Sequence, residues 1–384
     1  MKEIVVSAPG KVLLLGGYSV LERPNIALSL AVNNRVVVKI KNHQENKIII
    51  NIPQYPLTIS GNFINHNLIL NKKLTTEEDK FLRFVKAGLE INLQYLEYKT
   101  KKYFAGLEIT IINDKLFGFN NTKTGLGSSA ALVASLTAGL FLNYNLDIKQ
   151  HQNLIHNLAQ YIHFNVQGKL GSGFDVGTAI FGSQIYTRFS SNIFSNFPPN
   201  PDIIILAKKI EENWDYIIKP FSFPQCFFPV IWIFKKGRTI TPEMIKKINE
   251  FKNKDTNNYN KIISKLNQAN TNTIQALENI NNSKKNNDNL LLEFKKYFEE
   301  SRLLTKQLGK MANTEIETDQ ASNLIKQTLE NGAFVAKFPG AGGSDAIVAL
   351  CLTQQHQLQL QSFWQKQNIT LSPIVFSNQG LLEG

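Results

Sequence analysis

The chain has 384 residues, of which 43% are hydrophobic and 19% are charged, a balance typical of a globular protein with room for two hydrophobic cores. It has no run of eighteen apolar residues and opens in a strand pattern, so we expect no membrane span, no signal peptide and a cytoplasmic location. Two cysteines and six histidines without zinc spacing argue against a structural metal, and the net charge of +12 is too scattered for nucleic-acid binding and instead suits small anionic ligands.

Two extended apolar segments, 5–8 and 11–15, open the chain on either side of Pro9-Gly10. We predict two strands joined by a turn there, with Lys11 at the start of the second strand. Taken alone, a lysine at such a position is most simply a solvated surface residue. The second strand runs into a pair of glycines followed by Tyr18, so a backbone turn is expected there as well.

The next part of the chain predicts strands and then one long helix. Segments 26–40, 47–52 and 55–59 have the apolar and β-branched content of strands separated by polar turns. Thr75 is followed three residues later by Glu78, which is the pattern of a capping box at a helix start. Apolar residues at helical spacing follow it, and their simplest interpretation is a face packed on the core.

The strongest local motif is the segment 123–130, Lys-Thr-Gly-Leu-Gly-Ser-Ser-Ala, between a predicted strand at 107–113 and an apolar helix at 130–144. Its glycines let backbone amides turn toward a ligand, and the first amides of the helix add unpaired donors and partial positive charge. Such a cradle suits phosphate. Considered alone, the loop also fits a loose dinucleotide fingerprint or a packing turn, whereas a Walker A loop is excluded because Gly-Lys-Ser/Thr does not occur.

A predicted helix at 149–167 meets a second glycine-rich segment, 168–175, Gly-Lys-Leu-Gly-Ser-Gly-Phe-Asp. Its glycines end the helix and allow a ligand to approach the backbone closely. Asp175 is a candidate functional carboxylate, a helix cap, or both. His156 and His163 lie seven residues apart on one face of the preceding helix, and we assign neither a role because such histidines are more often packing or surface residues.

The second half of the chain begins after the prolines at 198–201, and we predict domains 1–205 and 206–384. The Asn- and Lys-rich segment 252–289 is left without a detailed assignment. The other predicted elements are a strand at 230–235, helices beginning at 241, 290 and 318, strands at 333–338 and 346–352 around the glycines of 339–343, a helix at 355–367 and a strand at 370–376. Their order predicts an α+β fold with a split βαβ arrangement in the second domain.

Four segments in this order resemble the motifs of the GHMP kinase superfamily, which phosphorylates small molecules with ATP. They are the segment 8–18, the glycine loop 123–130, the segment 168–175 and the third glycine loop at 339–345. The residues of these four motifs are most similar to those of the phosphomevalonate kinases within the superfamily. The resemblance spans about residues 5 to 350. The resemblance implies a ribosomal-protein-S5-domain-2-like N-terminal domain, a ferredoxin-like C-terminal domain, ATP and Mg²⁺ as cofactors, and a monomer or homodimer.

The resemblance also implies a role for individual residues. Lys11 and Asp175 would be catalytic, and Ser129 would be the hydroxyl that holds Mg²⁺. The nucleotide would be bound by Lys123, Gly125, Leu126, Gly127, Ser128, Ser129 and Ala130. The acceptor would be bound by Lys11, Tyr18, Lys169, Ser172, Gly342 and Gly343. Further cations that could meet the acceptor's phosphate are Lys101, Lys102, Lys235, Arg238 and Lys337, with Lys169 the first choice.

The reaction that the resemblance implies is ATP-dependent phosphorylation of (R)-5-phosphomevalonate to (R)-5-diphosphomevalonate, a step of isoprenoid precursor synthesis. A GHMP kinase acting on a hydroxyl, such as that of mevalonate, and a non-catalytic ligand sensor stay open as alternatives. Mevalonate kinases carry a glutamate metal ligand about eleven residues before the motif aspartate, where this chain has Phe164. A hydroxyl acceptor would need Asp175 as a base, whereas a phosphate acceptor, already mostly dianionic, would need it only to orient groups or metal.

Overall fold

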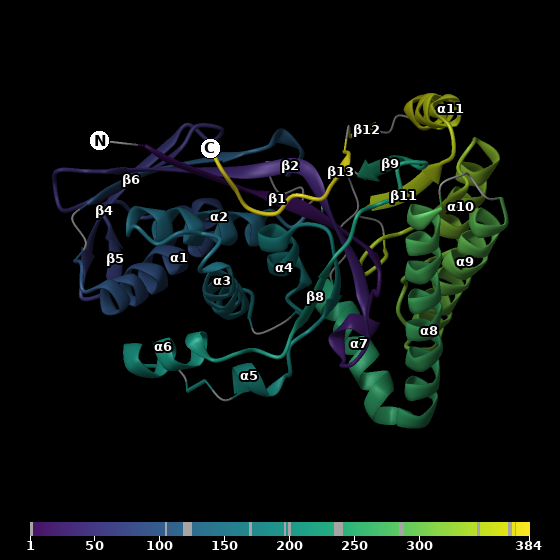
Figure 1. Cartoon of the computed structure of the whole chain (residues 1–384), viewed down its shortest axis with the longest axis horizontal. Helices are drawn as coiled ribbons and strands as arrows, with labels where there is room; N and C mark the ends of the chain where they lie inside the picture. Colours follow the sequence, from purple (N-terminus) through teal and green to yellow (C-terminus); the bar gives the residue numbers. More distant parts are fainter. Residues whose placement is uncertain are drawn as a thin grey trace.

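The computed structural model describes residues 3–103, 106–117, 125–168, 171–195, 197–198, 201–233, 241–283, 288–343, 346–367, 371–372 and 374–384. Its strands form one ten-stranded sheet and one four-stranded sheet. Figure 1 shows the larger sheet above a layer of helices, with a long helical hairpin beside the smaller sheet. The mixture of two sheets and helices confirms the predicted α+β class.

The larger sheet is built around the long antiparallel pair β1 (Ile4–Leu15) and β2 (Ala27–Asn42). Its main path is β14-β1-β2-β6-β3-β4-β5, with β7 and β13 also paired to β2 and β8 paired to β7. The pair β3–β6 is parallel and the other described pairs are antiparallel. The remaining strands are β3 (Ile48–Ile52), β4 (Leu57–Ile64), β5 (Asn67–Leu70), β6 (Leu107–Asn113), β7 (Gln184–Thr187), β8 (Ile217–Pro220), β13 (Phe376–Ser377) and β14 (Leu382–Glu383).

The prediction of two strands separated by a turn at Pro9-Gly10 is wrong, because β1 is continuous. Pro9 pairs with Arg35 while Lys11 pairs with Ala31, so the pairing register shifts between them. An irregularity of this kind bends a strand without ending it, and Pro9 and Gly10 are accommodated there. Lys11 therefore lies within a central strand of the sheet rather than at the start of a separate one.

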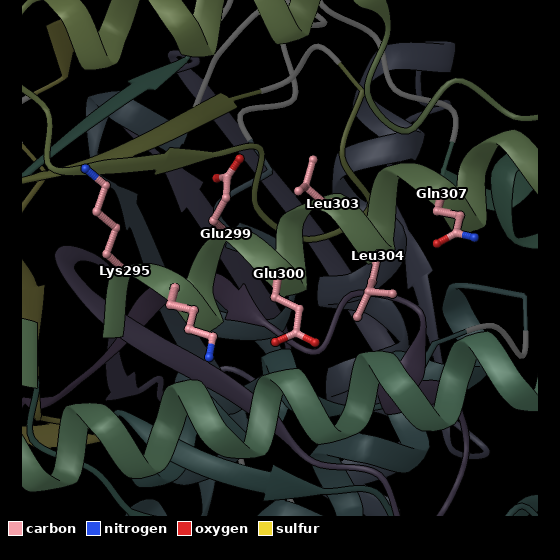
Figure 2. A pocket seen from close by; sticks show the side chains of 7 residues that line it. Lys295, Glu299, Glu300, Leu303, Leu304 and Gln307 are labelled. Carbon is pink, nitrogen blue, oxygen red and sulfur yellow. The ribbon is translucent and has the colours of Figure 1, made fainter. Parts of the chain in front are cut away.

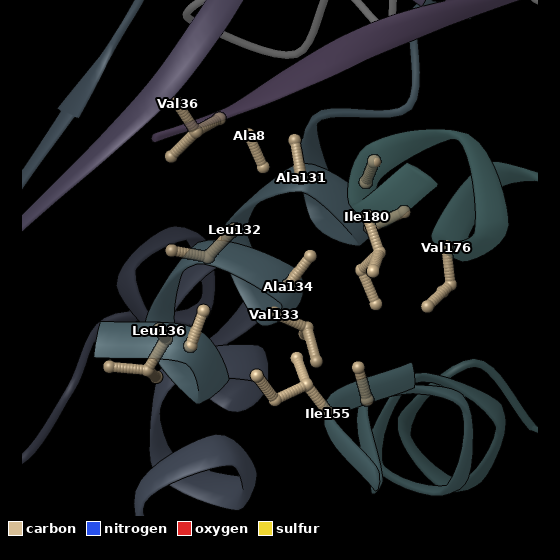
Figure 3. Packing of buried hydrophobic residues seen from close by; sticks show 14 of the residues in the cluster. Ala8, Val36, Ala131, Leu132, Val133, Ala134, Leu136, Ile155, Val176 and Ile180 are labelled. Atoms are coloured by element: carbon tan, nitrogen blue, oxygen red, sulfur yellow. The ribbon is translucent and has the colours of Figure 1, made fainter. Parts of the chain in front are cut away.

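Helices α1 (Thr76–Thr100), α2 (Ser128–Asn143), α3 (Gln152–Val166) and α4 (Phe174–Phe181) pack together beneath this sheet. All residues of α2 from 130 to 141 are buried, which explains why its sequence is apolar and small on every side. Figure 3 shows Ala131 of α2 beside Ala8 of β1, and Val133 beside Ile155 of α3. Helix α1 begins as predicted, with a capping box between Thr75 and Glu78. The N-terminus of α2 is thus held between the sheet and two other helices.

The smaller sheet has the order β10-β11-β9-β12, in antiparallel pairs. Chain order is β9, four helices, β10, β11, α11 and β12, which is a split βαβ arrangement and confirms the ferredoxin-like expectation for the second domain. Trp232 and Trp364 pack against each other in its core with ring centroids 4.7 Å apart. The elements are β9 (Phe228–Ile233), α7 (Thr241–Lys254), α8 (Thr256–Asn282), α9 (Asp288–Met311), α10 (Asp319–Glu330), β10 (Val335–Lys337), β11 (Ala346–Cys351), α11 (Gln354–Lys366) and β12 (Leu371–Ser372).

The structure defines two further parts of the second half, one that the sequence pattern left without a detailed assignment and one that it assigned wrongly. Most of the segment 252–289 is the 27-residue helix α8, which lies along α9 in Figure 1 and buries apolar residues such as Ile262 and Leu266. The single strand predicted at 370–376 is wrong. The chain forms the short β12 in the smaller sheet and then crosses to the larger one, where β13 and β14 pair with β2 and β1.

The predicted boundary at 205/206 lies inside α6 (Ile203–Glu211), which contacts α1 and α3. The division into 1–205 and 206–384 stays a prediction. The short elements are η1 (Ser19–Leu21), η2 (Lys115–Phe117) and α5 (Asn192–Ser195).

Candidate functional site

The glycine loop leads directly into the buried helix α2. Gly125 and Gly127 have φ angles of +70° and +78°, a region that side-chain-bearing residues rarely occupy. Gly127 is the N-cap of α2 and has no side chain to cap the helix, so the first backbone amides of α2 stay available as donors. With the partial positive charge of a helix N-terminus, this arrangement can bind an anion. Lys123, predicted in the same loop, lies outside the described residues.

Lys11 is held against this loop by both its backbone and its side chain. Its N–H donates to the Leu126 carbonyl at 2.8 Å, and its Nζ donates to the Gly125 carbonyl at 2.7 Å. A Cβ at Gly127 would lie 3.1 Å from Lys11 Cε, so the glycine leaves room for the lysine to pass. The Lys11 ammonium also lies 5.2 Å from the ring centroid of Phe174. The lysine thus joins the glycine loop to the residue that precedes Asp175.

Asp175 lies in the first turn of α4, whose N-cap is Gly173. The cap interpretation of Asp175 is therefore wrong in its strict sense, although its Oδ1 accepts a hydrogen bond from Val176 N–H at 3.0 Å. The other carboxylate oxygen, Oδ2, lies 4.0 Å from His163 Nε2. The side chain is 20% exposed, so one side of the carboxylate remains open to a ligand.

His163 connects Asp175 to the glycine loop, a role that our sequence reasoning missed. Its Nε2 lies 3.0 Å from Ser129 Oγ and shares a hydrogen bond with that hydroxyl. The ring is buried and stacks on Phe84 with centroids 5.4 Å apart. Burial lowers the pKa of His163, Asp175 raises it and Arg83 lowers it, with the net shift downward, so the imidazole is neutral at pH 7. No spacing rule could have found this contact, because Ser129 belongs to another helix.

The third glycine loop, around Gly340, is held in place by contacts with the end of β1 and with the turn at Gly16 and Gly17 that follows it. The Gly340 N–H donates to the Leu13 carbonyl at 2.9 Å, and the Tyr18 hydroxyl donates to the Ala341 carbonyl at 2.7 Å. The Gly343 N–H in turn donates to the Ile316 carbonyl at 2.8 Å. The loop is therefore docked on the end of β1. The structure brings Tyr18, Gly342 and Gly343 to this junction, and their role in acceptor binding stays a prediction.

The segment before Asp175 is described from Gly171 onward, so Lys169 lies outside the described residues. Ser172 is buried, and its carbonyl accepts a hydrogen bond from the Tyr186 hydroxyl at 2.8 Å. The Gly173 carbonyl accepts from Gln160 Nε2 at 2.6 Å. These bonds anchor the backbone of the loop on α3 and β7, which fixes where α4 and Asp175 begin.

Of the other predicted cations, Lys101, Lys102 and Lys337 lie in the described part of the chain, and their role at the acceptor's phosphate stays a prediction. Lys101 is the C-cap of α1 with its ammonium 4.5 Å from the Tyr98 ring centroid, and Lys102 is exposed. Lys337 is buried at the end of β10, where burial lowers its pKa to about 8 and Glu317 acts in the opposite direction. Lys235 and Arg238 lie outside the described residues.

A hollow along α9, shown in Figure 2, is a weaker candidate site. All of its lining side chains come from that one helix, among them Lys296, Glu300 and Leu304. None of the lining residues was singled out by the sequence, and groups from a single helix do not converge from several sides as those around Ser129 do. We therefore place the functional site at the N-terminus of α2.

Two broader properties concern the described residues as a whole. No helix among them combines the length and the apolar character needed to span a membrane. The same residues contain no cluster of three or more His, Cys, Asp or Glu side chains that could hold a metal ion by themselves. The cytoplasmic location and the monomeric or homodimeric state stay predictions.

Comparison with known proteins adds an independent observation. Residues 84–183 match the model described as GHMP kinases N terminal domain, and residues 276–370 match GHMP kinases C terminal. The chain is 26% identical to the peroxisomal phosphomevalonate kinase of Arabidopsis thaliana, covering 95% of this chain and 93% of that protein. It is 29% identical to the phosphomevalonate kinase of Saccharolobus solfataricus, covering 90% of each.

A solved structure has the same fold. Streptococcus pneumoniae phosphomevalonate kinase, in complex with phosphomevalonate and AMPPNP, superimposes with a TM-score of 0.74 at 19% identity. The superposition covers 97% of this chain and 100% of that one. The likeness therefore extends through both sheets rather than one domain alone.

Proposed function

Because the chain belongs to the GHMP kinase family, we propose that it catalyses ATP-dependent phosphorylation of (R)-5-phosphomevalonate to (R)-5-diphosphomevalonate, a step of the mevalonate pathway of isoprenoid biosynthesis. The observation that carries the proposal is the convergence of Lys11, Ser129 and Asp175 around the glycine loop. Phosphomevalonate kinases that match along nearly their whole length support the choice of acceptor.

In this reaction an oxygen of the acceptor phosphate attacks the γ-phosphorus of ATP. The bond to the β,γ-bridging oxygen breaks, and its electron pair leaves with ADP. A phosphate monoester has a second pKa of about 6, so at neutral pH the attacking oxygen needs no general base. The protein must instead align two anions and offset their repulsion. The glycine loop and the ammonium of Lys11 supply the positive potential, while Asp175 serves to orient groups rather than to remove a proton.

The side chains present fit a magnesium ion bound together with the nucleotide. Mg²⁺ prefers oxygen ligands, and Ser129 Oγ and Asp175 Oδ2 both lie within 4.0 Å of the same nitrogen of His163. Phosphate oxygens and water would complete the coordination. When bound, the ion neutralises charge on the β- and γ-phosphates.

The position that separates this chain from mevalonate kinases also supports a phosphate acceptor. Phe164 stacks on Phe194 with centroids 3.8 Å apart and an interplanar angle of 7°. An aromatic pair therefore occupies the place in the sequence where those enzymes carry a glutamate metal ligand. A hydroxyl acceptor, which needs a base and a strongly held metal, fits this arrangement less well.

A substrate panel tests the proposal. With purified protein, ATP and Mg²⁺, we expect ADP release to depend on phosphomevalonate, with a kcat/KM at least about 100-fold above that for mevalonate, because only the phosphate acceptor is already deprotonated. Coupled detection of ADP and phosphorus NMR of the product check the result. Equal or better turnover of mevalonate would move the assignment to a hydroxyl kinase, and binding of both ligands without turnover would indicate a sensor.

A second expected result concerns His163. Replacing His163 by Ala leaves the Ser129 hydroxyl without its partner, and we expect kcat to fall roughly 10-fold, the equivalent of one buried hydrogen bond. His163→Gln, which can still pair with Ser129, should recover part of the rate. His151→Gln near the start of α3 is the matched control, because His151 contacts the Asp147 carbonyl instead of Ser129. Unchanged kcat in His163→Ala with an unchanged melting temperature would contradict the role of His163.

A further inference from the structure

An arginine that the sequence reasoning did not single out joins two segments of the site. Arg188 directly follows β7, and its Nη1 donates to the Leu21 carbonyl at 2.7 Å. Its Nη2 donates to the Gly171 carbonyl at 3.3 Å. Leu21 ends the short helix after the Gly-Gly-Tyr turn, and Gly171 belongs to the loop that leads to Asp175. The guanidinium thus bridges the two segments that contain Tyr18 and Ser172, both predicted from the sequence to bind the acceptor.

The positive charge of Arg188 has no carboxylate partner among the described residues. Two backbone carbonyls use two of its five N–H donors, and its buried Nε has no hydrogen-bond partner in this part of the chain. The carboxylate of Glu22 interacts electrostatically with Arg188. However, Glu22 Oε1 already accepts hydrogen bonds from Lys252 Nζ at 2.8 Å and from the Tyr259 hydroxyl. Since an uncompensated, half-buried charge is destabilising, an anionic ligand is the natural partner for this guanidinium.

Arg23 shows the contrast within the same neighbourhood. Its Nη1 donates to the Arg188 backbone carbonyl at 2.9 Å, so the two arginines lie close together. The same Nη1 lies 3.2 Å from Asp215 Oδ2, which gives Arg23 an ion pair inside the protein. Arg188 differs from Arg23 in that no carboxylate among the described residues forms an ion pair with it.

Arg188 also lies on the Asp175 side of the structure. The Tyr186 hydroxyl bonds to the Ser172 carbonyl, which ties β7 to the loop before Asp175. Burial raises the pKa of Tyr186, Arg188 lowers it and Asp175 raises it, so both charged groups lie near this ring. The described contacts of the Arg188 guanidinium are with Leu21, Gly171 and Phe189, and they include neither Lys11 nor Asp175.

We propose that Arg188 binds the carboxylate of the acceptor and thereby selects a substrate that is anionic at both ends. This inference rests on the proposed function, because phosphomevalonate carries its reacting phosphate and its carboxylate at opposite ends of the carbon chain. The phosphate end belongs beside Lys11 and Asp175, and the far end is then left for Arg188. A planar guanidinium with free N–H donors matches a carboxylate in a two-point hydrogen-bonded pair.

Kinetics of two substitutions test the inference. In Arg188→Met we expect the KM for phosphomevalonate to rise roughly 10- to 100-fold, the loss expected for a charge-assisted pair, while the KM for ATP and kcat change only a few-fold. Arg188→Lys keeps the positive charge but loses the planar guanidinium with its paired N–H donors. Its KM for phosphomevalonate should therefore lie between those of wild type and Arg188→Met. Calorimetric titration of phosphomevalonate without nucleotide should show the same loss of affinity. Arg23→Met is the matched control and should leave the acceptor KM unchanged.

The methyl ester of phosphomevalonate identifies the group that Arg188 contacts. Wild-type protein should bind the ester 10- to 100-fold more weakly than phosphomevalonate, and Arg188→Met should no longer distinguish the two. If Arg188→Met weakens binding of the ester as much as that of phosphomevalonate, the carboxylate assignment is wrong. The ester measurement on wild type needs no substitution, so it holds even if the variant unfolds.

The two proposals fail in different ways. Turnover of phosphomevalonate by wild type with an unchanged acceptor KM in Arg188→Met overturns the inference and leaves the proposed function standing. Absence of wild-type turnover of phosphomevalonate overturns both.

Discussion

Replacing Lys11 by Met is expected to lower kcat by about 10²- to 10³-fold, which corresponds to about 3–4 kcal/mol of transition-state stabilisation. Negative charge on the transferring phosphoryl group and on the acceptor must be brought together, and the ammonium of Lys11 is held at the glycine loop. Methionine keeps most of the length of the side chain and removes the charge. The KM for ATP should change only a few-fold, because the backbone amides of the loop and of α2 stay in place.

Steady-state kinetics with both substrates, together with a melting temperature, check this result. The Lys11 side chain also bonds the Gly125 carbonyl, so a change in AMPPNP affinity would report any rearrangement of the loop itself. Lys41→Met is a suitable control, because Lys41 lies on the neighbouring strand β2 and pairs with Glu3 at 3.1 Å. A Lys11→Met variant with the full wild-type rate would show that Lys11 is not placed at the transferring phosphate.

Replacing Gly17 by Ala is expected to lower kcat/KM on the order of 100-fold and to destabilise the fold by about 1–3 kcal/mol. A Cβ at Gly17 would overlap the Gly340 carbonyl oxygen, which is backbone and cannot rotate away. Gly17 does not have a positive φ, so the backbone itself would accept alanine. The added methyl should instead push the third glycine loop off β1 and break the bond from Gly340 N–H to the Leu13 carbonyl.

Denaturant unfolding and steady-state kinetics measure the two parts of this effect. Gly139→Ala is the matched control, since it adds the same methyl in α2 against Cδ1 of Ile40, the mobile end of a side chain. We expect that control to stay within about 1 kcal/mol of wild type. If Gly17→Ala is as stable and as active as Gly139→Ala, the close contact between Gly17 and the third glycine loop is not needed for the site.

Several elements could be predicted because their signals are local. The strand at 107–113 and the helix starts after Thr75 and Thr318 were predicted where they are found. A capping box involves residues three positions apart, and a strand pattern is contained in its own segment. The break expected at Pro9-Gly10 was wrong because pairing with β2 continues across it. The tail after 370 was misassigned because β12 pairs with β9, whereas the following strands β13 and β14 pair with β2 and β1 near the start of the chain.

The sequence by itself determined which chemical groups are present. These are glycine turns that can bind phosphate, a lysine and an aspartate that each lie next to a glycine-rich segment, and an order of motifs typical of the GHMP kinases. Only the tertiary structure decided which of these groups meet. Lys11 reaches a carbonyl 114 positions away, and His163 reaches a hydroxyl 34 positions away. Such contacts arise from the packing of β1, α2, α3 and α4 around a shared core, which depends on all of these elements at once and leaves no trace in the spacing of any one segment.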